Sequence, residues 1–461
     1  MTLIKSISGI RGTIGGKSGE TLSPLDLVKF ASAYGTWIKT QTENYKVVIG
    51  RDARPSGHII AQIVAATLQG MGIDVLDLGL STTPTVEMAV IETAAGGGII
   101  ITASHNPVQW NALKLLNAEG EFIDAEAGQT IVELAENQVF DYVENTALGT
   151  YTLDQEGTYL QNHIDKILAL PLVDKEAIAN RNFRIVVDAV NSTGGIAVPL
   201  LLEALGVKEV TQMYCEPNGQ FPHNPEPLPE NLTDISREIA KGGYDLGIVV
   251  DPDVDRLAFV CEDGEMFGEE YTLVAIADYV LRNNAGATVS NLSSTQALRD
   301  ITQKAGQIYE ASAVGEVNVV KKMKAISAVI GGEGNGGVIY PELHYGRDAL
   351  VGIALFLTYL AKSEKQMTRL LATYPKYFIS KNKISLGAGI NVDNILHGVK
   401  EKYKVQPINT EDGVRIDFER GWIHLRKSNT EPVIRIYAES DSQPTADTLA
   451  QKIMRDIKEL V

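Results

Sequence analysis

A unit of strand, polar loop, helix and strand occurs three times along this chain, and the repetition limits the possible folds. The three copies span residues 47–76, 184–213 and 287–309, with helices expected at 58–71, 198–205 and 295–304. Their apolar strands do not alternate with polar residues, so helices are expected to cover both faces of each sheet. Three similar α/β domains are therefore predicted.

The last part of the chain follows another pattern and predicts a small α+β domain. Residues 414–418 and 422–425 alternate around a turn, which is typical of a β-hairpin. Further strands are expected at 384–386 and 433–437, and helices at 392–403 and 445–460. The predicted domains are 1–150, 151–255, 256–373 and 374–461.

Composition excludes several classes of partner. The net charge of −17 argues against nucleic acid or an anionic membrane as the main partner. No apolar run reaches the roughly 18–20 residues that span a bilayer, and the N-terminus does not resemble a signal peptide. Two cysteines outside any CxxC pattern fit a reducing cytoplasm. Seven scattered histidines argue against a histidine-based zinc site.

The turn at residues 102–107 follows the apolar run 99–101 and presents Ser104 at the end of a strand. Open α/β sheets place their chemistry at the carboxyl ends of strands. The neighbouring Ser104 and His105 suggest a hydrolase nucleophile with its base. However, the GxSxG elbow of the α/β-hydrolases is absent. The alternative is that this turn caps the next helix.

A second loop, residues 251–256, follows the apolar run 246–250 and carries three aspartates at alternating positions. Close carboxylates repel one another unless a cation lies between them. Oxygen ligands favour a hard divalent ion, with Mg²⁺ as the default. The alternative is a solvated acidic turn, which the strand-end position and the adjacent Arg256 make less favourable.

Two further loops offer groups for a sugar and for a phosphate. The glycine-rich run 331–337 follows an expected strand at 328–330 and contains Glu333 and Asn335, which suit sugar hydroxyls. Alone, it also fits a flexible turn. The run 426–435 frames hydroxyl and amide donors with two arginines, which suits a phosphate. The alternative there is a surface turn with Glu431 paired to an arginine. Basic residues at 8–12 and 50–57, and Lys114, would add cations around one dianion.

These motifs, in this order, resemble the α-D-phosphohexomutase superfamily, which includes phosphoglucomutase, phosphomannomutase and phosphoglucosamine mutase. The main motifs are TASHNP at 102–107, DPDVDR at 251–256, GEGNGG at 332–337 and RKSNTEPVIR at 426–435. SGIRG at 8–12, GRDARPSG at 50–57 and FPHNPEPLPENL at 221–232 agree as well. The resemblance spans the whole chain and implies four domains around a central cleft, the first three sharing one α/β topology.

The resemblance also implies a mechanism. Ser104 is expected as phosphoserine, with one Mg²⁺ per chain held by its phosphoryl group, Asp251, Asp253 and Asp255. The phosphate passes to a hexose phosphate and gives a bound 1,6-bisphosphate of glucose or glucosamine, which is also an activator. Glu333 and Asn335 hold the sugar. The non-reacting phosphate binds Arg426, Ser428, Asn429, Thr430 and Arg435. The remaining residues assigned to catalysis are Arg11, Lys114, His105 and Arg256, with His105 expected to shape the loop.

Two departures from the family pattern affect this expectation. Asn111-Ala112-Leu113-Lys114 stands where Asn-Gly-x-Lys is usual, and Gly337 stands where a histidine is common. His344 is a candidate replacement for that histidine. The GEGNGG form resembles archaeal-type members, which favours conversion of glucosamine 6-phosphate to glucosamine 1-phosphate. Phosphoglucomutase/phosphomannomutase, a Ser104-dependent phosphatase and a non-catalytic sugar-phosphate-binding protein are the alternatives. A cytoplasmic monomer or homodimer is expected.

Overall fold

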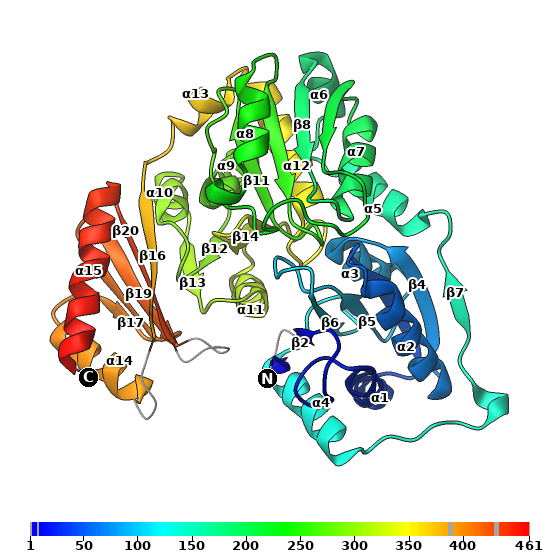
Figure 1. The fold of residues 1–461 in the computed structure, drawn as a ribbon. Helices are drawn as coiled ribbons and strands as arrows, with labels where there is room; N and C mark the ends of the chain where they lie inside the picture. The colour runs from blue at the N-terminus through cyan, green and yellow to red at the C-terminus, as the bar shows by residue number, and fades with distance from the viewer. Residues whose placement is uncertain (1, 7–8, 386–390, 428–432, 461) are drawn as a thin grey trace. The chain divides into compact units, whose positions relative to one another are not determined.

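The computed structural model describes residues 2–6, 9–385, 391–427 and 433–460. The chain forms two compact units, each assembled from two segments (Figure 1). The first unit contains Met1–Thr272 and Gly336–Thr368, and the second contains Leu273–Asn335 and Arg369–Val461. Helix α9 (Glu269–Asn283) and helix α13 (Met367–Leu371) lie where the chain passes from one unit to the other.

The first unit begins with a mixed sheet in the order β1-β2-β6-β5-β3-β4-β7. Strands β5, β3, β4 and β7 run parallel, and β6 is antiparallel to both β5 and β2. The strands are β1 (Ile4–Ser6), β2 (Gly9–Thr13), β3 (Lys46–Arg51), β4 (Asp74–Leu80), β5 (Gly97–Ile101), β6 (Trp110–Leu116) and β7 (Tyr151–Leu153).

Helices cover both faces of this sheet, as its unbroken apolar strands predict. Val47 and Ile49 of β3 pack in one core with α1, α2 and α4, whereas Val48 packs in a second core with α3. Successive side chains of a strand point to opposite faces, so β3 is buried on both sides. The helices are α1 (Pro24–Gln41), α2 (Gly57–Gly70), α3 (Thr83–Glu92) and α4 (Ala125–Asn137).

A second sheet in the first unit has the order β11-β10-β8-β9, with only β11 antiparallel. Its strands are β8 (Arg184–Asp188), β9 (Glu209–Met213), β10 (Leu246–Val250) and β11 (Leu257–Cys261). The neighbouring helices are α5 (Thr158–Leu168), α6 (Lys175–Arg181), α7 (Gly194–Ala204) and α8 (Thr233–Ala240). Strand β15 (Gly337–Ile339) and α12 (Ala349–Ser363) complete the unit.

Helix α7 begins four residues earlier than the sequence predicts, because the Gly194-Gly195 pair belongs to the helix and not to the preceding loop. A Cβ atom on Gly195 would lie 2.1 Å from the Cys215 carbonyl oxygen. These glycines therefore allow the first turn of α7 to approach the neighbouring chain closely.

In the second unit, β12 pairs in parallel with β13 and with β14. The expected strand at 328–330 is wrong, since β14 spans Ile330–Glu333 and takes in the first glycines of the predicted loop. The pairing of Gly331 with Val289 and of Gly332 with Ser290 extends the strand to Glu333. The other elements are β12 (Thr288–Asn291), β13 (Tyr309–Ser312), α10 (Ala297–Lys304) and α11 (Glu316–Ile326).

The tail is an α+β domain, as predicted. Its antiparallel sheet has the order β16-β20-β19-β18-β17 and shares one core with α14 and α15. The expected strand at 384–386 is the end of a longer strand, β16. The elements are β16 (Phe378–Ser385), β17 (Ile408–Asn409), β18 (Val414–Phe418), β19 (Gly421–Lys427), β20 (Val433–Ser440), α14 (Val392–Lys402) and α15 (Gln443–Leu460).

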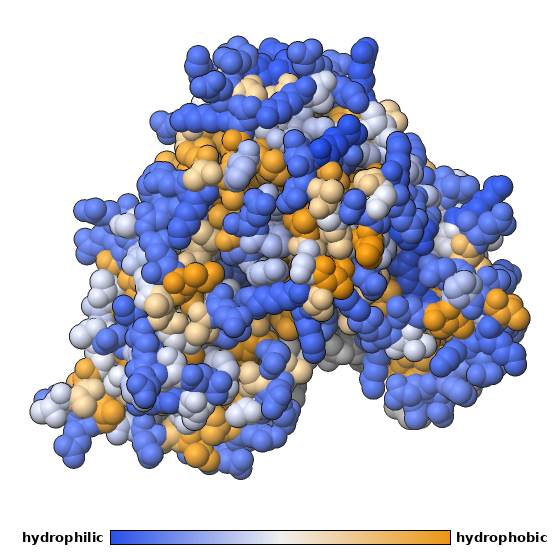
Figure 2. Space-filling view, turned by 180° about the vertical axis from the view of Figure 1, so that it is seen from behind, coloured by the Kyte–Doolittle hydropathy of each residue, from blue (hydrophilic) through white to orange (hydrophobic). Residues whose placement is uncertain are grey.

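Figure 2 shows a face on which hydrophilic residues dominate and apolar residues gather in separate patches. Among the described helices, none combines the length and the apolar character needed to cross a bilayer.

The hydroxyl of Tyr34 links α1 to the first sheet, and we expect it to contribute measurably to stability. It donates to the carbonyl oxygens of Leu116 at 2.6 Å and Gly98 at 3.1 Å, and Tyr34 is fully buried. Tyr34→Phe leaves buried carbonyls without this donor, which should cost about 1–3 kcal/mol and lower the melting temperature. Thermal unfolding followed by circular dichroism measures the change.

Tyr142→Phe is the control, because the Tyr142 hydroxyl hydrogen-bonds to Ser32, but Tyr142 itself is half exposed. We expect its melting temperature to stay close to that of the wild type. Equal effects of the two substitutions would contradict the role assigned to Tyr34.

Candidate active site

Ser104 lies in the turn between β5 and β6, at the carboxyl end of the central strand β5. Its backbone is left-handed, with φ of 48°, a conformation that is uncommon outside glycine and gathers at functional sites. The backbone N–H of Ser104 donates to Thr102 Oγ1 at 2.9 Å. Its hydroxyl donates to Asp251 Oδ2 at 2.8 Å and makes no recorded bond with His105. Strand β6 follows the turn, so the helix-capping interpretation is wrong.

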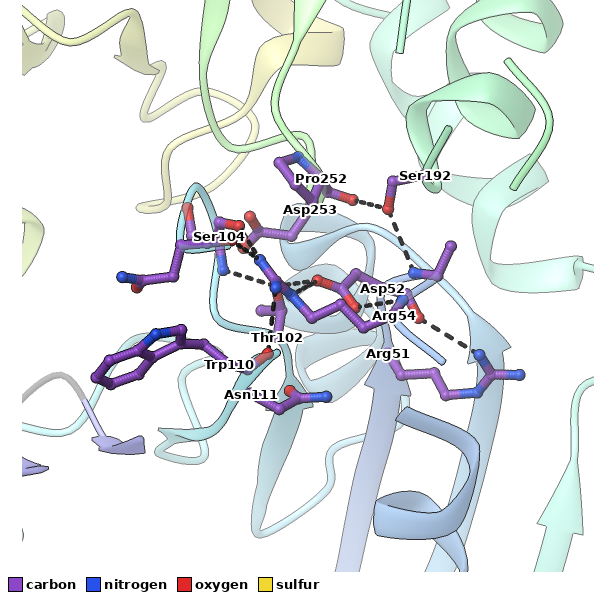
Figure 3. A network of polar contacts seen from close by, with 12 residues as sticks. Arg51, Asp52, Arg54, Thr102, Ser104, Trp110, Asn111, Ser192, Pro252 and Asp253 are labelled. Carbon is purple, nitrogen blue, oxygen red and sulfur yellow. Dashed lines mark hydrogen bonds and ion pairs between the residues drawn. The ribbon is translucent and has the colours of Figure 1, made fainter. Parts of the chain in front are cut away.

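Arg54 supports this turn from beneath (Figure 3). Its guanidinium donates to four carbonyl oxygens of the turn, those of Ser104, Asn106, Pro107 and Trp110. Its Nε donates to Asp52 Oδ2 at 3.0 Å, and Asp52 also accepts from Thr102 Oγ1 at 2.7 Å. Arg54 is only 1% exposed, so this basic residue holds the turn and does not face a ligand, contrary to the expectation that it adds a cation around the substrate.

Asp251, Asp253 and Asp255 follow β10 directly, as predicted, and all three are fully buried. They offer carboxylate oxygens that lie within 4.8 Å of one another. Asp253 Oδ1 and Asp255 Oδ1 have no hydrogen-bond partner among the described residues. Burial excludes a solvated acidic turn, and buried oxygens without donors fit a hard divalent cation.

Two cations offset part of this buried negative charge. Lys114 Nζ lies 2.7 Å from Asp253 Oδ2 and 3.4 Å from Asp255 Oδ2, and Arg347 Nη2 lies 2.7 Å from Asp255 Oδ2. Burial lowers the pKa of Lys114, but Asp253 and Asp255 outweigh burial and raise it above its usual range. Lys114 therefore stays protonated at neutral pH.

The aspartates themselves differ in pKa. Burial, followed by the charges of Asp253 and Asp255, raises the pKa of Asp251 well above its usual range. Burial acts in the same direction on Asp253, but Lys114 outweighs it and lowers the pKa of that carboxyl. A divalent cation bound by the three carboxylates would offset their mutual repulsion, which contributes to the raised pKa of Asp251.

Sequence reasoning missed Arg347 and Thr83. Thr83, at the start of α3, donates its hydroxyl to Asp253 Oδ2 at 2.6 Å. Arg347 precedes Asp348, the N-cap residue of α12, and follows strand β15, which begins at the last glycine of the glycine-rich motif. The basic residue before a helix cap was the available signal for Arg347, whereas nothing near Thr83 in the sequence pointed to the aspartate loop.

Glu226 gathers His105 and Arg256 beside the aspartate loop. Its Oε1 lies 3.3 Å from Arg256 Nη1 and 4.0 Å from His105 Nε2. Burial, together with the charge of Arg256, lowers the pKa of His105 well below its usual range. His105 is thus neutral at physiological pH. Arg11 lies in β2, opposite Ala112 and two positions from the site of Lys114 on β6.

In the second unit, Glu333 ends β14 and is 3% exposed. Its Oε1 accepts from Asn291 Nδ2 at 2.8 Å and from the Gly315 N–H at 3.0 Å. Asn335 follows and is half-buried. His344, in the first unit, is buried against Asp348 and Glu87, so it does not provide the loop histidine that the family pattern usually has.

Arg426 and Arg435 lie directly opposite each other on β19 and β20. Like charges in this position destabilise a sheet unless an anion or acid offsets them. Asp412 Oδ2 lies 2.8 Å from Arg426 Nε, and Arg435 is exposed. Ser428, Asn429 and Thr430, with Glu431, lie outside the described residues.

Family comparisons agree with this arrangement. The family models of "Phosphoglucomutase/phosphomannomutase" alpha/beta/alpha domains I, II and III match residues 3–141, 161–264 and 268–377. The model of the C-terminal domain of the same family matches residues 389–456. The chain belongs to the phosphoglucomutase/phosphomannomutase family of the α-D-phosphohexomutase superfamily. It is a phosphohexomutase, and therefore an isomerase.

Curated relatives carry more than one substrate name. A phosphoglucomutase/phosphomannomutase of Thermococcus kodakarensis is 35% identical, over 94% of this chain and 95% of its own length. A phosphoglucosamine/phosphogalactosamine mutase of Sulfurisphaera tokodaii is 30% identical, over 98% of both chains. A solved phosphoglucomutase/phosphomannomutase family protein of Burkholderia thailandensis has a TM-score of 0.85 at 25% identity, covering 99% of this chain and 97% of its own.

Arg54 allows a test of how the turn is held. Arg54→Lys keeps a positive charge but cannot reach four carbonyl oxygens, so Ser104 should shift from its position beside Asp251. We expect kcat to fall roughly 10- to 100-fold, with a smaller change in KM, because misplacement of a reacting group mainly affects the chemical step. Steady-state mutase kinetics measure this change.

Arg51→Lys is the control, since Arg51 adjoins the same strand end but makes one long contact, at 3.4 Å, with the Asp52 carbonyl oxygen. It should retain near-wild-type kcat. An unchanged kcat in Arg54→Lys would contradict the role of Arg54 in holding the turn.

Proposed function

We propose that this phosphohexomutase carries a phosphoryl group on Ser104 and converts glucosamine 6-phosphate to glucosamine 1-phosphate through a bound 1,6-bisphosphate. The main support is the hydrogen bond of 2.8 Å between Ser104 Oγ and Asp251, within a set of three buried carboxylates. Three buried carboxylates beside one hydroxyl are costly, because their negative charges are taken out of water. A cation bound together with a phosphoryl group on Ser104 would offset that cost.

Asp251, Asp253 and Asp255 are the residues that would hold Mg²⁺, one ion per chain. When bound, the ion neutralises charge on the phosphoryl oxygens during transfer. Lys114 and Arg347 provide fixed positive charge on the far sides of Asp253 and Asp255. Because Lys114 keeps its proton, its proposed part is electrostatic rather than that of a general base.

The chemical step exchanges one phosphate ester for another. The bond between phosphorus and Ser104 Oγ breaks as a bond to a free sugar hydroxyl forms, and that hydroxyl loses its proton. Ser104 regains a proton and returns to the hydrogen bond with Asp251. The other phosphate of the bisphosphate then transfers back to Ser104, which leaves the product with its phosphate on the other oxygen. Arg11, His105 and Arg256 are proposed to orient the reacting groups.

Groups of the second unit are proposed to bind the rest of the substrate. Arg426 and Arg435 lie opposite each other on the adjacent strands β19 and β20. An anion between them would relieve their repulsion, which supports a phosphate-binding role. Ser428, Asn429 and Thr430 are assigned to the same phosphate by sequence alone. Glu333 and Asn335 are assigned to the sugar.

The sugar assignment is supported by the relatives and by one carboxylate. Several relatives are named probable phosphoglucosamine mutases, and Glu333 supplies a negative charge that suits a 2-ammonium group. A solved relative, the N-acetylphosphoglucosamine mutase of Aspergillus fumigatus, is described in complex with GlcNAc-6P and magnesium. The alternative is a phosphoglucomutase/phosphomannomutase, the name given to a relative in Pseudomonas putida.

Ser104 is tested by mass spectrometry and by substitution. Purified protein incubated with a hexose 1,6-bisphosphate should carry one phosphate, on Ser104. Ser104→Ala should remove that phosphate and lower kcat at least about 1,000-fold, because no other residue replaces a covalent carrier. Ser18→Ala, at an exposed serine, should change neither.

Phosphate on another residue, or full activity of Ser104→Ala with a bisphosphate primer, would contradict this mechanism. Release of inorganic phosphate at the rate of sugar turnover would instead favour the phosphatase alternative.

The substrate is tested with a coupled assay on glucosamine, glucose, mannose and N-acetylglucosamine phosphates. We expect the highest kcat/KM for glucosamine 6-phosphate. Glu333→Gln keeps an oxygen for Asn291 and Gly315 but removes the charge, so it should lower kcat/KM about tenfold or more for glucosamine 6-phosphate and less for glucose 6-phosphate. An equal loss on both sugars would contradict the glucosamine preference without contradicting the mutase mechanism.

A further inference from the structure

A second cluster of ligating side chains lies in the first unit, and the proposed mechanism does not use it. His163 of α5, His344 of the loop before α12 and Asp348 at the N-cap of that helix come together in the interior. His163 Nε2 lies 2.9 Å and His344 Nε2 3.2 Å from the same oxygen, Asp348 Oδ2. The three side chains are at most 2% exposed.

His163 and Asp348 each have a second hydrogen-bond partner, and His344 has a carboxylate near its other ring nitrogen. His163 Nδ1 lies 3.0 Å from Thr85 Oγ1, and His344 Nδ1 lies 3.4 Å from Glu87 Oε2. The other oxygen of Asp348 accepts from the backbone N–H groups of Leu350 at 2.8 Å and Val351 at 3.2 Å. Histidines that bind metals usually donate their other ring nitrogen to a carboxylate or a similar acceptor. His163 has this arrangement with Thr85, whereas His344 Nδ1 makes no hydrogen bond with the described residues.

The spacing suits a tetrahedral ion. Ligand atoms about 2.0 Å from a tetrahedral metal lie roughly 3.3 Å apart, and the two nitrogen–oxygen distances need to open by no more than a few tenths of an ångström to reach that value. The rings of His163 and His344 are nearly perpendicular, at 89°, so their Nε2 lone pairs approach Asp348 from different directions.

Charge balance also favours a cation. Asp348 and Glu87 place two carboxylates in the interior, and a divalent ion would offset their charge.

The loop that carries His344 is shaped for this approach. A Cβ atom on Gly346 would lie 1.9 Å from Glu87 Oε2 and 2.8 Å from a ring carbon of His344, so any other residue there would push the loop away from α3. The sequence argued against a histidine-based zinc site because no two histidines have a ligand spacing. The ligands come from segments far apart in the chain, and only the fold brings them together.

We propose that His163, His344 and Asp348 form a buried structural site for a borderline transition-metal ion, and that Zn²⁺ is the preferred ion. Imidazole nitrogen distinguishes this site from the all-oxygen aspartate site, which suits Mg²⁺. The ion ties together α3, α5 and α12. The same elements hold the aspartate loop, since Ala349 N donates to the Val254 carbonyl oxygen at 3.2 Å and Thr83 of α3 bonds Asp253.

The test separates the two sites by metal preference. Metal-free full-length protein is dialysed against a small molar excess of Zn²⁺ in the presence of millimolar Mg²⁺ and then desalted. The zinc that remains bound is measured by inductively coupled plasma mass spectrometry. The wild type should retain about one zinc per chain, because Mg²⁺ occupies oxygen sites and competes poorly for imidazole. Asp348→Asn should retain at least tenfold less, and His58→Gln, at an exposed histidine, should match the wild type.

Two further variants keep the result decisive. Asn is also a good N-cap residue, so Asp348→Asn should fold, and circular dichroism checks this; His163→Gln gives an independent loss of one ligand. Asp253→Asn should retain zinc, since it affects only the aspartate site. Zn²⁺ should also raise the melting temperature of the wild type and not that of Asp348→Asn. A wild type without bound zinc, undiminished zinc in folded Asp348→Asn and His163→Gln, or loss of zinc in Asp253→Asn would each overturn the proposal.

Discussion

The burial of three aspartates in one short loop is the constraint on which the first unit depends. Asp251, Asp253 and Asp255 have no exposure to solvent, so every neighbouring element has to offset their charge. Lys114 comes from β6, Arg347 from the approach to α12 and the Thr83 hydroxyl from α3. Removing one of these partners would leave a buried charge without compensation, which strongly destabilises a folded protein.

The serine turn satisfies a different requirement, that of position. Ser104 adopts a left-handed backbone, which costs conformational energy, and Arg54 holds the turn through its carbonyl oxygens. A guanidinium with five N–H donors is the one side chain that can reach so many acceptors from a single point. The Ser104 hydroxyl, which we propose as the phosphate carrier, is therefore positioned by a residue whose own side chain is buried.

Sequence reasoning predicted the fold class and placed the Ser104 turn and the aspartate loop at strand ends, because those depend on local patterns. Apolar runs without alternation indicated buried strands, and β10 ends at Val250, where the aspartate loop was expected to begin. It could not predict contacts between distant segments. Arg54 was read as a cation for the substrate, since a sequence does not show that the Ser104 turn lies above it. Arg347, Thr83 and the His163–His344 pair were missed for the same reason, and the glycines at 331–332 were read as loop although β12 pairs with them.

Arg426 and Arg435 lie opposite each other on β19 and β20, and their proposed role in phosphate binding bears on the stability of this sheet. Their repulsion weakens the sheet where the two strands meet, and Asp412 offsets only the Arg426 side. An anion that bridges the two arginines would restore part of that lost stability. Under the phosphate-binding role proposed for Arg426 and Arg435, substrate binding would therefore also stabilise the pairing of β19 with β20.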